Sequence, residues 1–147
     1  MPLEIRRSAA RGELPKVFKW VRKGGLVDAH CSATTRDGRP TTGTLLLAAA
    51  VHDHLALVRE LLKRGASVDL QSSFGGTALT NAAFYGHLFI VLVMLQHSAN
   101  PDLQDLKGGT ALMWATYHGH GACVKALLRA KANTELHDNN GITALMG

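Results

Sequence analysis

Four threonines recur at one fixed interval, and this spacing constrains the fold of the chain more than any other feature. Thr44, Thr77, Thr110 and Thr143 follow one another at steps of 33 residues. Leucines two positions after them, and histidines and valines ten and fourteen positions after the first three, recur in step. A period of this length is typical of a solenoid, in which stacked units cover one another's hydrophobic sides. We therefore expect function to depend on the surface that the stack presents.

Each unit predicts two short helices joined by tight turns. In the second unit, glycines permit a turn, Thr77 can cap a first helix with its hydroxyl group, and Gly86 ends that helix. The apolar run from Leu88 to Leu95 predicts a second, more buried helix, which ends before Pro101. One helix pair has too little interior to be stable alone, so stacking must close the core.

These units resemble ankyrin repeats. Residues 107–115 (KGGTALMWA) are similar to the family signature G-x-T-P-L-H-x-A, and residues 117–120 (YHGH) to the x-x-G-H that follows it. Residues 124–128 resemble the V-x-x-L-L of the second helix, and residues 65–69 the closing G-A-x-x-D/N. The resemblance covers nearly all of residues 44–147 and extends more loosely to residues 5–28. It implies an all-α ankyrin-repeat solenoid of stacked helix-turn-helix units with β-hairpin-like loops.

The resemblance also divides the chain, which we interpret as one ankyrin-repeat domain over residues 1–147. Its expected parts are an N-terminal capping repeat (1–28), an extended loop (29–43), three repeats (44–71, 72–104 and 105–137) and the start of a truncated repeat (138–147). The loop is either a tolerated insertion, which we favour, or a finger that reaches toward a partner. Since the last repeat stops short, we expect either further chain or another surface to cover Ala126 and Leu127.

Some positions depart from the family pattern. Leu45, Ala78, Ala111 and Ala144 occupy the first helical position, where the family usually has proline. Ser98 and Lys131 occupy the turn position that Gly65 fills after an earlier second helix. We expect both to adopt the left-handed conformation, which costs a residue other than glycine about 1 kcal/mol.

The net charge of +5 is concentrated near the N-terminus. Residues 1–23 contain seven basic and two acidic side chains, and the rest of the chain is balanced. We interpret Lys16, Lys19 and Lys23 as the solvated face of the capping repeat, with Trp20 in the core. The alternatives are nuclear targeting or docking on an acidic surface. The longest apolar run has eight residues, too few to span a bilayer, and Cys31 and Cys123 have no paired spacing. These observations predict a cytoplasmic or nuclear protein.

The sequence shows no pattern that predicts catalysis. His52 with His54, and His118 with His120, stand at alternate positions that do not share a helix face. We expect His54, His87 and His120 instead to hydrogen-bond backbone between adjacent units. Cys123 is expected to be buried, and Cys31, beside His30, to be exposed. Phosphate-binding and dinucleotide-binding motifs are missing. We therefore predict a protein that is not an enzyme, with no cofactor and no metal.

The resemblance places recognition on the hairpin tips and on the exposed side of the first helices. Four of the aromatic residues there fall where no core residue is needed, and exposed aromatic groups are typical anchors of interfaces. Trp114 is expected to lie in a half-buried seam. The candidate residues are Ser73, Phe74, Leu106, Lys107, Asn139 and Asn140 at the tips, and Val51, His52, Phe84, Tyr85, Tyr117 and His118 on the helices.

These observations predict a non-catalytic protein–protein interaction module with a concave and hairpin-tip recognition surface. The expected partner is another protein, and the chain is expected to be monomeric unless another chain covers its C-terminal end. One alternative is a regulatory or targeting segment of a larger protein with its catalytic domain beyond residue 147. A second is docking on nucleic acid or an acidic membrane through the basic N-terminal helices.

Overall fold

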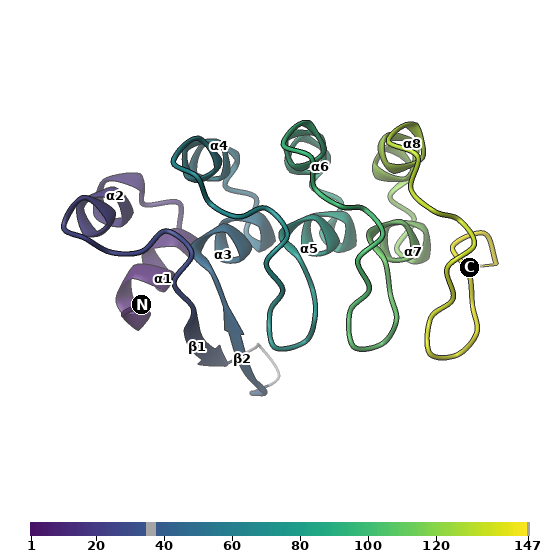
Figure 1. Ribbon diagram of the computed structural model, residues 1–147, viewed down its shortest axis with the longest axis horizontal. Helices are drawn as coiled ribbons and strands as arrows, with labels where there is room; N and C mark the ends of the chain where they lie inside the picture. The colour runs from purple at the N-terminus through teal and green to yellow at the C-terminus, as the bar shows by residue number, and fades with distance from the viewer. Residues whose placement is uncertain (35–37, 147) are drawn as a thin grey trace.

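The computed structural model describes residues 1–34 and 38–146. Figure 1 shows two rows of helices, with loops that extend beyond one of them. The row next to the loops contains the first helix of each pair, and the other row contains the second helix. The prediction of an all-α solenoid is confirmed. The first helices are α1 (Leu3–Ala10), α3 (Leu45–Val51), α5 (Ala78–Tyr85) and α7 (Ala111–Tyr117), and the second helices are α2 (Leu14–Arg22), α4 (Leu55–Lys63), α6 (Leu88–Gln96) and α8 (Gly121–Arg129).

The repeated threonines begin the first helices. The side-chain oxygens of Thr44, Thr77 and Thr110 accept hydrogen bonds from the backbone N–H groups three residues later, at 3.3, 3.1 and 3.3 Å. Each bond satisfies an N–H group that has no partner within the helix, and such caps stabilise a helix by about 1 kcal/mol. The period of 33 residues therefore corresponds to one structural unit.

Left-handed residues end the helices, as predicted. Gly86 has a φ of 75° after α5, and Gly65 has a φ of 87° after α4. Ser98 and Lys131, which stand where Gly65 does in later units, both have a φ of 61°. Asp53 occupies the equivalent of Gly86 in the preceding unit with a φ of 60°, which we did not predict.

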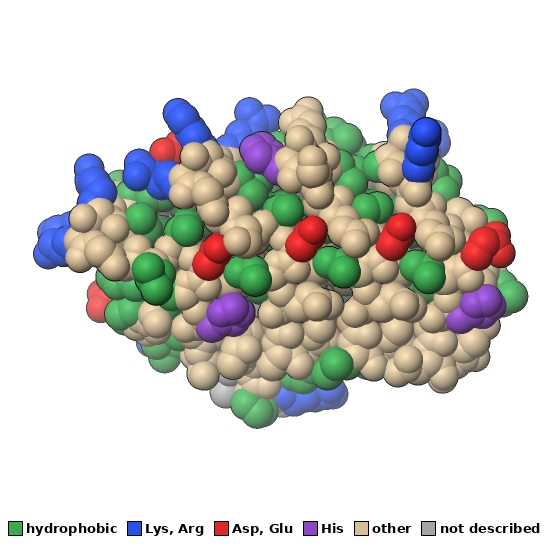
Figure 2. Space-filling view, in the orientation of Figure 1, with side chains coloured by type: hydrophobic (Ala, Val, Ile, Leu, Met, Phe, Trp, Pro, Cys, Tyr) green, Lys and Arg blue, Asp and Glu red, His purple; other side chains and the backbone are tan. Residues whose placement is uncertain are grey.

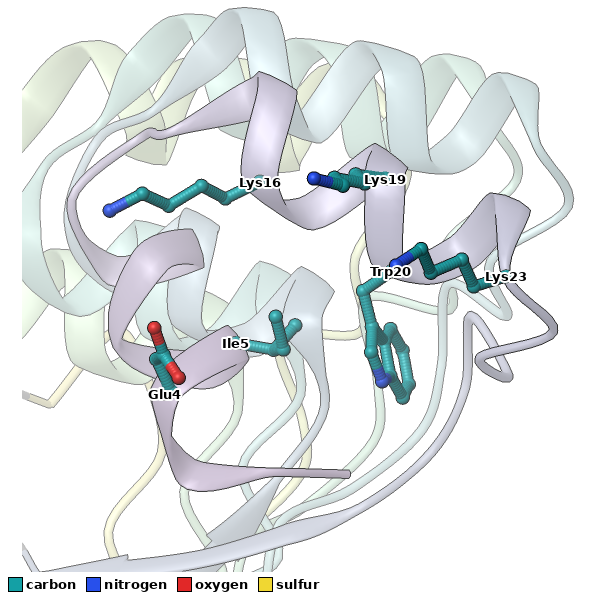
Figure 3. A pocket seen from close by; sticks show the side chains of 6 residues that line it. All are labelled: Glu4, Ile5, Lys16, Lys19, Trp20 and Lys23. Atoms are coloured by element: carbon teal, nitrogen blue, oxygen red, sulfur yellow. The ribbon is translucent and has the colours of Figure 1, made fainter.

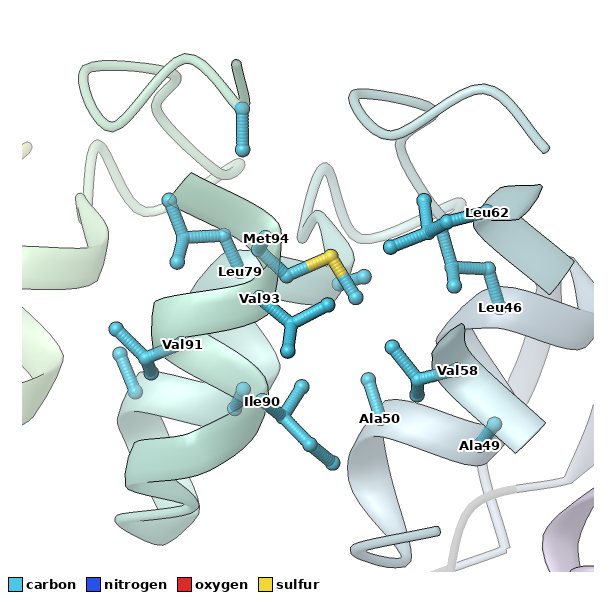
Figure 4. Packing of buried hydrophobic residues seen from close by; sticks show 14 of the residues in the cluster. Leu46, Ala49, Ala50, Val58, Leu62, Leu79, Ile90, Val91, Val93 and Met94 are labelled. Atoms are coloured by element: carbon cyan, nitrogen blue, oxygen red, sulfur yellow. The ribbon is translucent and has the colours of Figure 1, made fainter. Parts of the chain in front are cut away.

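The core lies between the two rows of helices and continues from unit to unit. Figure 4 shows Leu46 and Leu79 of first helices beside Val58 and Met94 of second helices. Small residues bring the first helices close together, since Ala82, Ala83 and Ala115 are fully buried. Stacking is thus what removes the apolar side chains from water.

Helix α6 is the more buried helix that its apolar run predicts, but it is not buried on every side. Ile90, Val91 and Met94 are fully buried, but Phe89 is 67% exposed and Leu92 is 38% exposed. Phe89 and Leu92 stay exposed because α4 and α8 cover only part of the α6 surface.

The segment of residues 29–43 is also more regular than the predicted loop. Strands β1 (Cys31–Thr34) and β2 (Pro40–Gly43) pair antiparallel, from Cys31 opposite Gly43 to Thr34 opposite Pro40. Residues 35–37 of the predicted loop lie outside the described residues. The prediction of an exposed Cys31 was wrong, because β1 contacts α1 and the Cys31 side chain is only 6% exposed.

The end of the chain also differs from expectation. Residues 138–146 form turns, and within the described chain Ala126 and Leu127 are already buried without a further surface. Thr143 and Ala144 are buried as well. The exposed hydrophobic residues near this end are Leu128, Ile142, Leu145 and Met146.

Candidate partner-binding surface

The six predicted tip residues are all exposed, on three successive hairpin-like loops. Backbone hydrogen bonds join these loops. The N–H of Leu106 donates to the carbonyl of Phe74 at 3.0 Å, and the N–H of Asn139 donates to the carbonyl of Lys107 at 2.9 Å. The side-chain amide of Asn139 also donates to the carbonyl of Leu106 at 2.8 Å. The tips therefore form one connected surface.

Asp105 holds the middle tip in place. One of its oxygens accepts from the N–H groups of Lys107 and Gly109, both at 2.9 Å. Its other oxygen accepts from the indole Nε1 of Trp114 at 2.7 Å. The carboxylate thus joins the tip to helix α7. Trp114 is half-buried, as predicted, but this bond was not foreseen.

A row of aspartates links successive units beside the second helices. Carboxylate oxygens of Asp28, Asp69 and Asp102 accept from the N–H groups of Ser67, Asn100 and Asn133, at 2.9, 2.9 and 2.7 Å. Figure 2 shows acidic side chains in a row across the middle of the molecule. The sequence signal for these links was the aspartate that ends the G-A-x-x-D/N pattern.

The recurring histidines also join neighbouring units, as predicted. The Nε2 atoms of His54, His87 and His120 lie 2.6, 3.1 and 3.0 Å from the carbonyl oxygens of Ala10, Val51 and Phe84. Each acceptor lies near the end of the first helix of the preceding unit. Among the described residues, no three His, Cys, Asp or Glu side chains lie close enough together to hold a metal ion.

Five aromatic rings meet where α5 and α7 end. The Phe84 ring lies 4.9 Å from Tyr85, 5.4 Å from Trp114 and 4.2 Å from His118, between ring centroids. Tyr117 lies 5.0 Å from His118 and 6.2 Å from Trp114. We call these five residues the aromatic cluster. It includes four of the predicted helix residues and Trp114, which was left out of the predicted set.

Exposure within the aromatic cluster is uneven. Tyr85 is 50% exposed and Tyr117 is 75% exposed, whereas Phe84 and Trp114 are half-buried. Phe84 packs against the neighbouring unit, since its ring lies against Trp114 and His118. Aromatic pairs of this kind contribute about 0.5–1.5 kcal/mol beyond burial. Phe84 therefore supports the cluster that Tyr85 and Tyr117 present.

The remaining predicted helix residues lie one unit earlier. Val51 is half-buried, and its carbonyl oxygen lies 3.1 Å from Nε2 of His87. His52 is exposed at the end of α3, and its ring lies 6.4 Å from that of His54. Tyr85 lies 5.8 Å from His87, which is the ring contact that continues the cluster toward this unit.

The basic N-terminal helices surround a shallow cavity of about 300 Å³. Figure 3 shows Lys16 and Lys19 of α2, and Lys23 directly after it, around the cavity, with Trp20 beside them and Ile5 on α1. Trp20 was predicted to lie in the core. Its side chain packs against the core but is only half-buried, because it lies on the outermost unit.

Lys16, which lines this cavity, forms an ion pair within the chain. Lys16 Nζ lies 3.2 Å from Glu13 Oε2. A hydrogen bond with Ser8 and the proximity of Lys16 lower the pKa of Glu13 from its ordinary value of 4.5. Arg6 is half-buried, so it is less available to a partner than its sequence position suggests.

Comparison with known families agrees with this architecture. The family model described as ankyrin repeats (3 copies) matches residues 7–105 and 95–146. The chain belongs to the ankyrin repeat family. Ankyrin repeats are generally protein–protein interaction modules. A search of curated proteins found no match to this ankyrin-repeat chain. Within the part of the chain that the structure describes, no helix has the length and apolar character needed to cross a membrane.

Proposed function

We propose that this ankyrin-repeat domain is a non-catalytic module that binds another protein through its hairpin tips and the exposed side of its first helices. The observation that carries this proposal is the aromatic cluster. Tyr85 and Tyr117 present large, amphipathic side chains from adjacent units. Tyrosine and tryptophan are enriched among the residues that contribute most to protein–protein affinity.

The support beneath the two tyrosines strengthens the proposal. Phe84 packs on Trp114, and Trp114 is held by the carboxylate of Asp105. Asp105 also binds the backbone of the adjoining tip. A partner that contacts both the tip and the cluster would therefore meet a surface ordered before binding, which reduces the entropy lost on association.

The two alternative functions stay predictions. A regulatory or targeting role within a larger protein would use the same surface. Docking on nucleic acid or an acidic membrane through the N-terminal helices has weaker support, because Arg6 is half-buried and Lys16 is paired with Glu13. We place partner recognition on the aromatic cluster instead.

The test compares two variants that both remove exposed aromatic rings. Tyr85→Ala with Tyr117→Ala alters the aromatic cluster, whereas Phe89→Ala alters the second-helix row. Proteins captured by the wild-type chain are quantified by mass spectrometry for each variant. Loss of two interface anchors is expected to weaken binding by about 30-fold or more. The captured partner should thus disappear with the tyrosine variant and persist with Phe89→Ala.

The proposal is wrong if the tyrosine variant keeps the wild-type circular dichroism spectrum and melting temperature yet captures the same partner to the same extent. Loss of capture in the Phe89→Ala variant alone would instead place recognition on the second helices.

A further inference from the structure

Helix α6 differs from the other second helices in its exposed side chains. Its outward positions hold Phe89 and Leu92, which are 67% and 38% exposed. At the same positions α4 has Ala56 and Arg59, and the corresponding residues of α8 are alanine and lysine. Among the four second helices, all within the described residues, α6 is the one without a charged side chain. Its outer surface is therefore an apolar ridge.

The helices on either side of α6 carry exposed basic side chains. Arg59 and Lys63 of α4 are exposed on one side, and Lys125 and Arg129 of α8 are exposed on the other. Glu60, the acidic residue within α4, is 3.1 Å from Arg64. We define the α6 ridge as Phe89 and Leu92, and Arg59, Lys63, Lys125 and Arg129 as the basic residues that flank it.

A groove widens the apolar part of the ridge toward α8. It has a volume of about 300 Å³ and is lined by Leu88, Leu92, Ala122 and Ala126, with Lys125 and Arg129 at its edge. The alanines of α8 leave this space because they are too short to fill it. Apolar surface and positive charge therefore meet along two adjacent helices.

Positive charge also gathers on the second helices, although the net charge of the sequence is concentrated near the N-terminus. The second helices with their caps contain nine Lys or Arg residues and two Glu residues, an excess larger than the +5 of the whole chain. Acidic residues of later units offset this positive charge in the net charge of the chain. Many of these acidic residues lie in loops and not on the second helices. Figure 2 shows basic side chains along the edge where the second helices lie, apart from the acidic row.

Charge argues against a second copy of the chain as the occupant of the ridge. In a twofold dimer through α6, the basic residues on either side of one ridge would face the basic residues of the other. Like charges placed across an interface oppose association. The complementary surface must instead combine negative charge with a region that accepts Phe89 and Leu92.

We propose that the α6 ridge docks on the surface of a membrane that contains anionic lipids. Phe89 and Leu92 insert at the boundary between head groups and acyl chains, while Arg59, Lys63, Lys125 and Arg129 contact lipid phosphate and carboxylate groups. Aromatic and apolar residues bordered by Lys and Arg are the composition that binds this boundary. The basic residues lie on the helices at both sides of the ridge, so both sides can contact a broad anionic membrane surface. The aromatic cluster is on the first helices, so a protein partner could bind at the same time.

The experiment measures co-sedimentation of the whole chain with phosphatidylcholine vesicles that contain or lack phosphatidylserine. The wild-type chain should bind only the vesicles with phosphatidylserine, and added salt should weaken binding. Phe89→Ala with Leu92→Ala should reduce the partition coefficient by about tenfold, since less apolar surface is inserted. Lys125→Gln with Arg129→Gln should reduce it as well.

Two control variants separate this proposal from the others. Tyr85→Ala with Tyr117→Ala removes rings from the aromatic cluster and should leave vesicle binding unchanged. Lys16→Gln with Lys19→Gln lowers the charge of the N-terminal helices and should have a smaller effect than the α8 variant. Circular dichroism melts establish that each variant is folded.

Three results would overturn the proposal. They are no binding to phosphatidylserine vesicles, binding that folded Phe89→Ala, Leu92→Ala protein retains in full, and binding lost mainly in the Lys16, Lys19 variant. The first result would leave the ridge to an acidic amphipathic helix of a protein partner. None of these results bears on protein capture by the aromatic cluster, so the two proposals fail independently.

Discussion

The contact between Gly109 and Trp114 allows a sharp test of how the aromatic cluster is held. A Cβ atom on Gly109 would lie 2.5 Å from Nε1 of Trp114 and 2.8 Å from Cε2. The equivalent glycine one unit earlier, Gly76, has room, because its Cβ would lie 3.6 Å from the nearest atoms of Asn81. Neither glycine has a positive φ, so alanine causes no backbone strain at either position.

We expect Gly109→Ala to destabilise the chain by about 2–4 kcal/mol. The added methyl group displaces the indole, and a hydrogen bond to a charged group contributes about 1.5–3 kcal/mol. The bond lost is the one between Trp114 Nε1 and Asp105 Oδ2 at 2.7 Å. Displacement also loosens the ring contact with Phe84, at about 0.5–1.5 kcal/mol. Gly76→Ala should lie between neutral and about 1 kcal/mol stabilising, because alanine restricts the unfolded chain.

Urea denaturation followed by circular dichroism and tryptophan emission measures both free energies of unfolding. Trp114→Asn supplies a further control, since asparagine is the residue found at the equivalent position of the previous unit. In that background Gly109→Ala should cost much less, and the double-mutant cycle isolates the contact. Equal free energies of unfolding for Gly109→Ala and Gly76→Ala would refute the reasoning. So would an unchanged cost of Gly109→Ala in the Trp114→Asn background.

Two further predictions concern burial and charge. Ala115→Glu places an unpaired carboxylate at a fully buried position between units and should lower the free energy of unfolding by several kcal/mol. Ala122→Glu, at an exposed position, should change the free energy of unfolding little. Equal denaturant midpoints for the two variants would contradict the burial argument. Glu13 has a pKa lowered in the folded chain by Ser8 and Lys16, so its stabilising effect should be present above the ordinary value of 4.5 and be lost as pH falls through the lower folded value. Thermal melts should therefore give the wild type a higher melting temperature than Glu13→Gln at neutral pH but not at acidic pH. A difference in melting temperature that grows as the pH falls would contradict this prediction.

The parts of the fold that sequence predicted well are those decided by local backbone chemistry. A threonine hydroxyl reaches the N–H three residues later whatever surrounds it, which explains why the capping role of Thr77 was predictable. Ser98 and Lys131 inherit their left-handed conformation from the position that Gly65 fills. The histidine bonds were predictable for a related reason, because a fixed period repeats the same geometry at every junction.

The candidate site was predicted only in part. Tyr85 and Tyr117 are exposed as expected, but Phe84 is half-buried against the next unit. Trp114 belongs to the aromatic cluster because Asp105, nine residues earlier, binds its indole. The ring contacts of Phe84 with Trp114 and His118 join different units, so the composition of a single unit does not contain them.

The amino-acid sequence by itself determined the repeat, the helix boundaries and the residues that join one unit to the next, since these depend on contacts that recur with the period. Only the tertiary structure decided several other features, which concern burial and the distribution of charge on the surface. Cys31 is buried where β1 contacts α1, Phe89 is exposed on α6, and positive charge gathers on the second helices although most of the chain is balanced in sequence. Exposure and electrostatic potential depend on which segments lie side by side, and stacking brings together residues that are a whole unit apart along the chain.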